Sequence, residues 1–387
     1  MTARLLLGRQ LAALGDIDWT IVTGDPYPDA PDDLHVELVP IRREFSASDP
    51  ATLVRLVRLF RAERFDFVQT HTPKPSFLGL PAARLTGTPS IYTVHGALYF
   101  RGNGRAANVL GWCFERWCCT WANRVVVQSR EDEDVLAAVG ICPRRKLSYI
   151  GNGIATEYFA APVPPAVLPD VEGAAPAGQA ERPTDEELPV VLMVSRLVRE
   201  KGCSDFLEIA RRLRGRARFV HVGPTETDQS DALSEDEIAA ASGTVTFIGA
   251  VADVRSYLAC ADVVVLPSYR EGIPRAVMEA AAAGRPIVAY DIRGVREVVD
   301  PELGLLVPRG DVAGMVGRVS ELVDDPEGRR ALGKQCQRWV LERFREDEVV
   351  ERLRSLYADQ PTRGDRPDGG REHARTAGGG ADPRSRR

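Results

Sequence analysis

Short apolar segments alternate with helical patterns along both halves of the chain, and this alternation restricts the possible folds more than any other feature. The first half contains β-rich runs such as FDFVQT and RVVVQS, and the second half contains runs such as VVLMVSR and VVVLPS. Each run is almost continuously apolar, as expected for a strand that is covered on both faces of a parallel sheet. We therefore predict an α/β protein with two doubly wound, Rossmann-like domains.

Composition indicates where these domains begin and end. Residues 161–188 are rich in Pro, Ala, Gly and Glu without any periodicity, which predicts a flexible linker. This assigns residues 1–160 to an N-terminal domain and residues 189–358 to a C-terminal domain, whose last helix is free to pack back on the first domain. Residues 359–387 have too few apolar side chains to bury a core, and we expect a disordered tail there.

The start of the chain departs from the pattern. It opens on an expected helix over residues 3–14, although a parallel sheet of this kind normally begins with a strand and a glycine turn. We expect the first strand of the N-terminal domain to be absent, either because the fold lacks it or because the true start codon lies upstream. We favour the second explanation.

The overall composition excludes several classes of protein. The net charge of −5 gives no indication of nucleic-acid binding. The seven cysteines show neither the paired spacing of a metal site nor a disulfide framework, which favours the reducing cytoplasm. No window is apolar enough for a membrane span, and the first residues do not resemble a signal peptide.

Two glutamates flank a predicted helix start in the C-terminal half. Pro274 suits the first turn of a helix over residues 274–283, so Glu271 falls in the preceding loop and Glu279 inside the helix. A rise of about 1.5 Å per residue separates the two by roughly 10 Å. This spacing suits a long ligand held at two places, and the alternative is a pair of exposed glutamates with no function.

Two cations fall in the equivalent position after the first strand of this domain. Arg196 and Lys201 lie where they can hold a diphosphate, Arg through its planar guanidinium and Lys as a point charge. Neither Gly272 nor Ile273 is a strong helix cap, which leaves the first N–H groups of the helix available to a ligand. The alternative for the two cations is a solvated loop.

Taken together and in this order, these motifs resemble the donor-binding half of glycosyltransferase family 4, which has the GT-B fold of two Rossmann-like domains facing a central cleft. QTHTPKP, SIYTVHG and SYIGNGIATEYF resemble segments of the first domain of members that build surface polysaccharides and lipid-linked oligosaccharides. The resemblance implies transfer of a sugar, with retention, from a nucleotide-diphosphate donor to a glycan or polyprenyl-linked acceptor. It favours a UDP-sugar as the donor, and it implies neither a metal nor another cofactor.

The resemblance also assigns roles to individual residues. Arg196 and Lys201 would neutralise the departing diphosphate, Glu271 would bind the sugar and Glu279 the ribose. The donor site would comprise Arg196, Lys201, Glu271, Gly272, Ile273 and Glu279. The residues expected to take part in catalysis are His95, Arg196, Lys201 and Glu271.

The N-terminal domain supplies the other expected side chains. His95 would lie close to the transferred sugar, with a buried structural histidine as the alternative. We assign His71 and Lys74 to the acceptor side, where they would contact a phosphate, and place Asn152 near the crevice between the domains. A plain turn explains Asn152 almost as well.

Two further features have structural explanations that we favour. The Asp-x-Asp triplets at 16–18 and 132–134 look structural, so we expect no metal site. The segment AANVLGWCFERWCCTWANR places tryptophans beside arginines, which suits a helix at the inner face of a membrane, but packing on the sheet explains the same face. Peripheral membrane contact is therefore a hypothesis that rests mainly on the family.

Two alternatives to a transferase remain open. A nucleotide-sugar epimerase of the same fold would require further acid and base residues in the cleft. A protein that binds a sugar nucleotide without turnover is the second alternative, because the family's glycine-rich turn after the first strand is missing.

Overall fold

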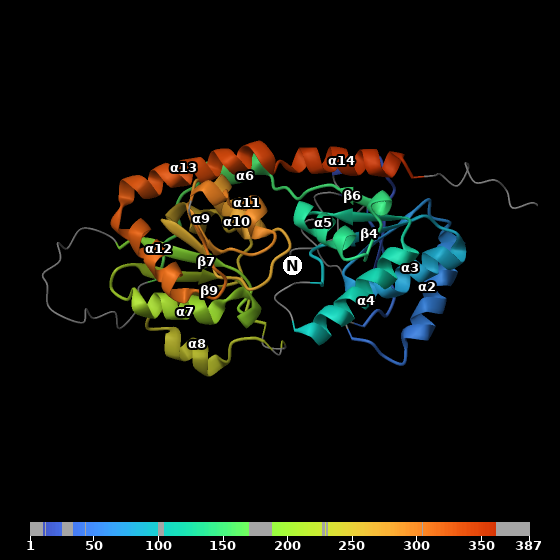
Figure 1. The fold of residues 1–387 in the computed structure, drawn as a ribbon, viewed down its shortest axis with the longest axis horizontal. Helices are drawn as coiled ribbons and strands as arrows, with labels where there is room; N and C mark the ends of the chain where they lie inside the picture. Colours follow the sequence, from blue (N-terminus) through green and yellow to red (C-terminus); the bar gives the residue numbers. More distant parts are fainter. Residues whose placement is uncertain are drawn as a thin grey trace, which may run out of the picture.

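The computed structural model describes residues 11, 13–24, 34–42, 44–99, 104–169, 188–226, 229, 231–303 and 305–360. Within these residues the chain forms two α/β lobes that lie side by side (Figure 1). All strand pairs in the described sheets are parallel, as the nearly continuous apolar runs predict.

The strands of the first lobe fall into two groups. Four neighbouring strands form one sheet in sequential order: β3 (Val68–His71), β4 (Ser90–Val94), β5 (Arg124–Val127) and β6 (Leu147–Tyr149). The other group is a separate parallel pair of β1 (Thr20–Thr23) and β2 (His35–Leu38). Among the described residues no strand pairs with both β1 and β3, so the sheet is interrupted where the first strand of a doubly wound order would lie. Residues 1–10, which include most of the helix expected over 3–14, lie outside the described residues.

Helices connect these strands and cover the sheet. They are α2 (Asp49–Glu63), α3 (Pro73–Thr86), α4 (Arg105–Trp121), α5 (Arg130–Ala138) and the short 3₁₀ helix η1 (Arg144–Lys146). In α2 the apolar spacing predicts the packing face, since Leu56 and Phe60 are buried against α3 together with Leu78.

The second lobe is a six-stranded sheet with the order of a dinucleotide-binding fold. Its strands, from edge to edge, are β12 (Leu306–Val307), β11 (Ile287–Tyr290), β10 (Val263–Leu266), β7 (Val190–Val194), β8 (Arg218–Val222) and β9 (Val245–Gly249). The direction of winding reverses between β7 and β10, and in such sheets the loops at the carboxyl ends of these two strands form the ligand crevice.

The helices of the second lobe surround this sheet. In chain order they are η2 (Arg199–Lys201), α7 (Cys203–Arg212), α8 (Glu235–Ala241), α9 (Arg255–Cys260), α10 (Arg275–Ala282), α11 (Val295–Val298), η3 (Pro301–Leu303), α12 (Val312–Asp324) and α13 (Pro326–Arg343). Helix α10 agrees to within a residue at each end with the helix that the sequence predicts over 274–283.

The chain crosses between the lobes at two adjacent places. The first crossing leads into α6 (Thr156–Ala160), which belongs to the range assigned to the first domain but packs on the second lobe through Phe159. The second leads from α13 to α14 (Glu346–Ala358), whose Leu353 is buried on the first lobe. At the crossing, Ile154 N donates to Phe344 O (3.0 Å) and Glu346 N donates to Ile154 O (3.0 Å).

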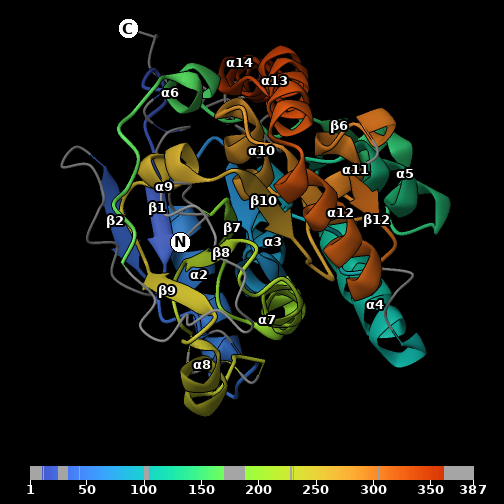
Figure 2. The same cartoon turned by 90° about the vertical axis from the view of Figure 1, so that its left-hand side faces the viewer.

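The figures show the consequence of this exchange. Helices α13 and α14 run one after the other above both lobes in Figure 1, and Figure 2 shows α13 above α10. Most of the expected linker, residues 170–187, and residues 361–387 of the expected tail lie outside the described residues.

Candidate active site

An ion pair joins the two loops at the point where the winding of the second sheet reverses. Lys201 ends η2 after β7, and Glu271 lies in the loop between β10 and α10. Lys201 Nζ and Glu271 Oε2 are 2.8 Å apart, and the side chains are only 17% and 11% exposed. The sequence placed both residues at this edge of the sheet, and the structure brings them into direct contact.

The backbone next to Lys201 explains why a glycine follows it. Gly202 has a φ of +73°, which side-chain-bearing residues rarely adopt. A Cβ at this position would also overlap the carbonyl oxygen of Pro267 in the β10 loop. Glycine therefore lets the two loops approach closely enough for Lys201 to reach Glu271.

Arg196 lies on the same segment after β7 and has an acidic partner of its own. Arg196 Nη1 is 2.8 Å from Glu226 Oε2, and the two side chains are 37% and 29% exposed. Glu226 comes shortly after β8 and belongs to none of the motifs described above. Both cations expected to bind a diphosphate are thus paired with carboxylates in the structure.

Backbone N–H groups and a second glutamate complete this edge of the site. The N–H groups of Gly272 and Ile273 donate to no acceptor among the described residues. Helix α10 begins after Pro274 without a side-chain cap, as expected. Within the helix, Glu279 Oε1 is 3.5 Å from Arg275 Nε.

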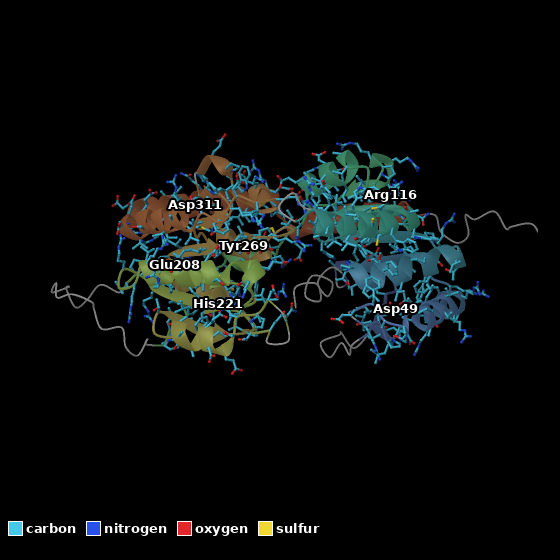
Figure 3. The ribbon with its side chains drawn as sticks, turned by 60° about the horizontal axis from the view of Figure 1, so that its bottom comes forward. Asp49, Arg116, Glu208, His221, Tyr269 and Asp311 are labelled. Atoms are coloured by element: carbon cyan, nitrogen blue, oxygen red, sulfur yellow. The ribbon has the colours of Figure 1, made fainter. Side chains whose placement is uncertain are left out.

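A pair of tyrosines steadies the loop that carries Glu271. Asp205 Oδ2 accepts hydrogen bonds from the hydroxyls of Tyr269 and Tyr290, each at 2.7 Å. Figure 3 labels Tyr269 on the second lobe. The bond from Tyr269 fixes the loop two residues before Glu271, so the position of this loop does not depend on the Lys201 contact alone.

The first lobe touches this loop directly. A Cβ on Gly272 would overlap the carbonyl oxygen of His95, and a Cβ on Gly96 would lie 3.1 Å from Gly272 Cα. Gly96 has a φ of +132°. The segment that carries His95 therefore packs backbone to backbone against the segment that carries Glu271, and the two expected halves of the site meet.

The imidazole of His95 is held on both sides by protein groups. Its Nε2 lies 3.0 Å from Nδ1 of His71, and its Nδ1 lies 3.2 Å from Oε1 of Gln128. Burial lowers the pKa of His71 to about 3, with a smaller contribution from His95, and burial also lowers the pKa of His95. Both imidazoles are therefore neutral at physiological pH. Gln128 was not singled out from the sequence, although it is the first polar residue after RVVV.

Lys74 and Asn152 use their polar groups within the protein. Lys74 Nζ is 2.6 Å from Asp49 Oδ2 and donates to Glu44 O (2.7 Å), and Asp49 is labelled on the first lobe in Figure 3. Asn152 Oδ1 accepts from the N–H of the following residue at 2.9 Å. The crevice position expected for Asn152 still holds, because Gly153 O accepts from Arg275 Nη1 of the second lobe at 3.1 Å. No contact joins Lys74 to His71 among the described side chains.

Neither a metal cluster nor a membrane-spanning helix is found in the described part of the chain. No three His, Cys, Asp or Glu side chains of the described residues are grouped as metal ligands would be. Asp132 of the second Asp-x-Asp triplet is instead 3.0 Å from Arg293 Nε. No helix in the described ranges is both long and apolar enough to cross a membrane.

Two family models match the two halves of the chain. Residues 5–158 match the model for Glycosyltransferase Family 4, and residues 188–325 match the model for Glycosyl transferases group 1. The first match covers the strands and helices from β1 to β6, and the second covers those from β7 to α12.

Relatives of known sequence extend over most of the chain. It is 29% identical over 332 residues to the putative glycosyltransferase EpsD of Bacillus subtilis, covering 83% of this chain and 84% of that protein. It is 26% identical over 319 residues to the Escherichia coli UDP-Gal:alpha-D-GlcNAc-diphosphoundecaprenol alpha-1,3-galactosyltransferase, covering 80% of each.

Solved structures show the same fold at lower identity. Sucrose-phosphate synthase of Thermosynechococcus elongatus superposes with a TM-score of 0.73 at 23% identity, covering 92% of each chain. Anabaena Alr3699/HepE in complex with UDP and glucose superposes with a TM-score of 0.73 at 18% identity, covering 92% of this chain and 96% of that one. The chain therefore belongs to glycosyltransferase family 4, and it is a glycosyltransferase with the GT-B fold.

Proposed function

We propose that this glycosyltransferase moves a sugar from a nucleotide-diphosphate donor to a glycan or lipid-linked acceptor of the cell envelope. The observation that carries the donor assignment is the Lys201–Glu271 ion pair at the crevice of the second sheet. It places a cation, a carboxylate and the unpaired N–H groups of Gly272 and Ile273 at one edge of the fold. The cation and the N–H groups suit the phosphates of a sugar nucleotide, and the carboxylate suits its hydroxyls.

Charge exchange explains how the donor binds. A diphosphate brings more negative charge to Lys201 and Arg196 than a single carboxylate does, so both cations turn from Glu271 and Glu226 toward the phosphates. Glu271, released from Lys201, then accepts hydrogen bonds from sugar hydroxyls. Glu279 would accept from the ribose in the same way. The family resemblance supports both contacts.

The cations also supply the catalytic effect. Negative charge develops on the diphosphate as the bond to the sugar breaks, and positive charge already in place there lowers the barrier by about 2.7–4 kcal/mol for each well-placed group. We propose that this replaces a metal ion and that the sugar is transferred with retention. The family resemblance supports both proposals.

Names of relatives support the choice of donor and acceptor. The Escherichia coli relative is named for UDP-Gal and a diphosphoundecaprenol acceptor, and a Campylobacter jejuni relative is also named for a diphospho-undecaprenol acceptor. A Mycobacterium tuberculosis relative is instead named for GDP-mannose. We propose a UDP-sugar and a polyprenyl-diphosphate-linked acceptor for this chain.

A lipid-linked acceptor implies that the enzyme works at a membrane surface, and α4 offers a suitable face. Val109 and Leu110 are 61% and 71% exposed, and Arg105 and Arg116 lie on the same helix. Figure 3 labels Arg116 on the first lobe. Trp117 packs partly within the protein, since its ring stacks on Phe77 of α3 with centroids 5.3 Å apart. We propose that the exposed part of α4 contacts anionic lipid.

A transfer assay tests the proposed function. The full chain is incubated with N-acetylglucosaminyl-diphosphoundecaprenol and, separately, UDP-galactose, UDP-glucose, UDP-N-acetylgalactosamine or GDP-mannose, and the lipid product is followed by mass spectrometry. We expect transfer from a UDP-sugar, unchanged by EDTA. Nucleotide binding without transfer from any donor would instead favour the non-catalytic alternative. Conversion of the sugar without transfer would favour the epimerase.

A further inference from the structure

Three polar side chains line up at the ends of three neighbouring strands of the first lobe. His71 is the last residue of β3, His95 follows β4, and Gln128 follows β5. These strands are parallel neighbours, so their carboxyl ends lie at one edge of the sheet. The side chains form a continuous chain, with 3.2 Å from Gln128 Oε1 to His95 Nδ1 and 3.0 Å from His95 Nε2 to His71 Nδ1.

The order of donors and acceptors along this chain follows from its buried end. The amide oxygen of Gln128 can only accept, so Nδ1 of His95 must carry the hydrogen. A neutral imidazole has one hydrogen, which leaves Nε2 of His95 as an acceptor. Nδ1 of His71 must then donate to it. Two ring nitrogens then lack a hydrogen, and Nε2 of His95 already accepts from His71, which leaves Nε2 of His71 as the acceptor without a partner in this row.

That last nitrogen remains available to a substrate. Among the described residues, Nε2 of His71 has no hydrogen-bond partner. It is also not one of the fully buried polar atoms that lack a partner there. The residue as a whole is only partly buried, so Nε2 can meet a ligand without displacing a described protein group. Since burial keeps the pKa of both imidazoles low, the nitrogen stays a hydrogen-bond acceptor throughout the physiological range.

The location of these hydrogen-bonded side chains indicates which substrate group His71 would meet. The backbone of His95 packs against Gly272, next to the loop that carries Glu271. His71 lies one strand further into the first lobe, with ring centroids 5.2 Å apart. An acceptor hydroxyl that reaches a sugar held by the Glu271 loop from the side of the first lobe would meet His71.

We propose that His71 presents an imidazole nitrogen to the acceptor, and that its Nε2 accepts a hydrogen bond from an acceptor hydroxyl. His95 and Gln128 act as positioning residues that fix the tautomer of His71. This inference rests on the proposed function, because it assumes that a sugar donor occupies the crevice.

Two substitutions at one position separate this role from a structural one. An Asn amide can take the place of Nδ1 and keep the contact with His95, whereas a Gln amide can take the place of Nε2 and offer an acceptor oxygen to substrate. His71→Asn should lower kcat/KM for N-acetylglucosaminyl-diphosphoundecaprenol by roughly 10- to 100-fold. His71→Gln should stay within about threefold of the original enzyme, and the affinity for UDP should be unchanged in both. The reverse order, or equal losses in both variants, would overturn the proposal.

A spectroscopic measurement checks the tautomers without any substrate. The chain has five histidines, so ¹⁵N-labelled imidazole spectra can be assigned with single His→Gln variants. Between pH 6 and 8, His71 and His95 should both show a protonated Nδ1 and an unprotonated Nε2. A protonated Nε2 on His71 would refute the proposal.

The outcomes also distinguish this proposal from the proposed function. If the unsubstituted chain transfers no sugar from any donor, the proposed function fails and the substrate role of His71 fails with it. If the chain transfers sugar and His71→Asn is fully active, the function stands and only the role of His71 is wrong.

Discussion

At the scale of single residues, one buried acid stands out because its charge opposes folding. Glu115 on α4 is 1% exposed, and it accepts from the Tyr92 hydroxyl (2.9 Å) and from Leu98 N (3.1 Å). Burial is the main cause that raises the pKa of Glu115 from 4.5 to about 7, against the opposing effect of these hydrogen bonds. The protonated form therefore predominates in the folded protein at mildly acidic pH.

This leads to a pH-dependent stability with a definite sign. Because the pKa of Glu115 is higher in the folded than in the unfolded chain, the folded state binds more protons, and the free energy of unfolding falls as pH rises from about 4.5 through 7. Glu115→Gln cannot ionise and keeps an acceptor for Leu98 N. Its free energy of unfolding should fall less than that of the original protein over this range, by at most about 3 kcal/mol.

Urea denaturation at pH 5 and at pH 7.5 measures this difference. Glu63→Gln is the matched control, because Glu63 is an exposed carboxylate at the end of α2. If Glu115→Gln loses as much stability between the two pH values as the control does, then Glu115 ionises normally in the folded protein.

The sequence could predict some site residues better than others. Lys201 and Glu271 follow strands and belong to ordered motifs, so their place at one edge of the sheet could be inferred. Gln128 and Arg293 carry no motif that the sequence analysis recognised, and their roles depend on partners that lie far away along the chain. Lys74 shows the converse, since its motif indicated a ligand and the structure pairs it with Asp49.

At the scale of elements, hydrophobic periodicity predicts the strands and helices well, and their packing less well. The helix expected over residues 274–283 appears as α10, Arg275–Ala282. The sequence placed residues up to 160 in the first domain, but α6 packs on the second lobe through Phe159. Spacing along the chain reports which side of a helix is apolar, but not which lobe that side will meet.

Helix α4 is the element for which two uses of one apolar face compete. Phe114 and Trp117 stack with Phe77 of α3, which supports the packing interpretation for that part of the face. Val109 and Leu110 remain exposed, which leaves the first half of the helix available for lipid.

Flotation with vesicles tests the exposed half of α4. The protein should float with phosphatidylglycerol vesicles and less with phosphatidylcholine, because Arg105 and Arg116 favour anionic lipid. Replacing both Val109 and Leu110 by Ser should reduce binding by roughly 100-fold if both side chains are fully buried in the lipid, since burial of each is worth about 1.5 kcal/mol. Val54→Ser on α2, also at an exposed valine, should have no effect. Equal flotation of both variants would exclude α4 as the contact.

At the scale of the whole molecule, the two lobes are joined by more than the crossing chains. Arg293 of the second lobe is buried and donates to the carbonyls of Ala97 (2.7 Å) and Tyr99 (2.9 Å) in the first. Glu297 accepts from Ser129 Oγ and from the N–H of Glu131 (2.9 Å) at the start of α5. These polar contacts hold the segments that carry His95 and Glu271 against each other.

From this arrangement we infer that a nucleotide diphosphate binds between the lobes by displacing Glu271 from Lys201. Titration calorimetry of Lys201→Met with UDP and with GDP tests this claim. Lys334→Met is the matched control, because Lys334 is an exposed lysine on α13. We expect the original chain and Lys334→Met to bind UDP equally, and Lys201→Met to bind it roughly 10- to 100-fold more weakly, since one charge-assisted contact is lost. Unchanged affinity in Lys201→Met, or binding of neither nucleotide by the original chain, would contradict the claim.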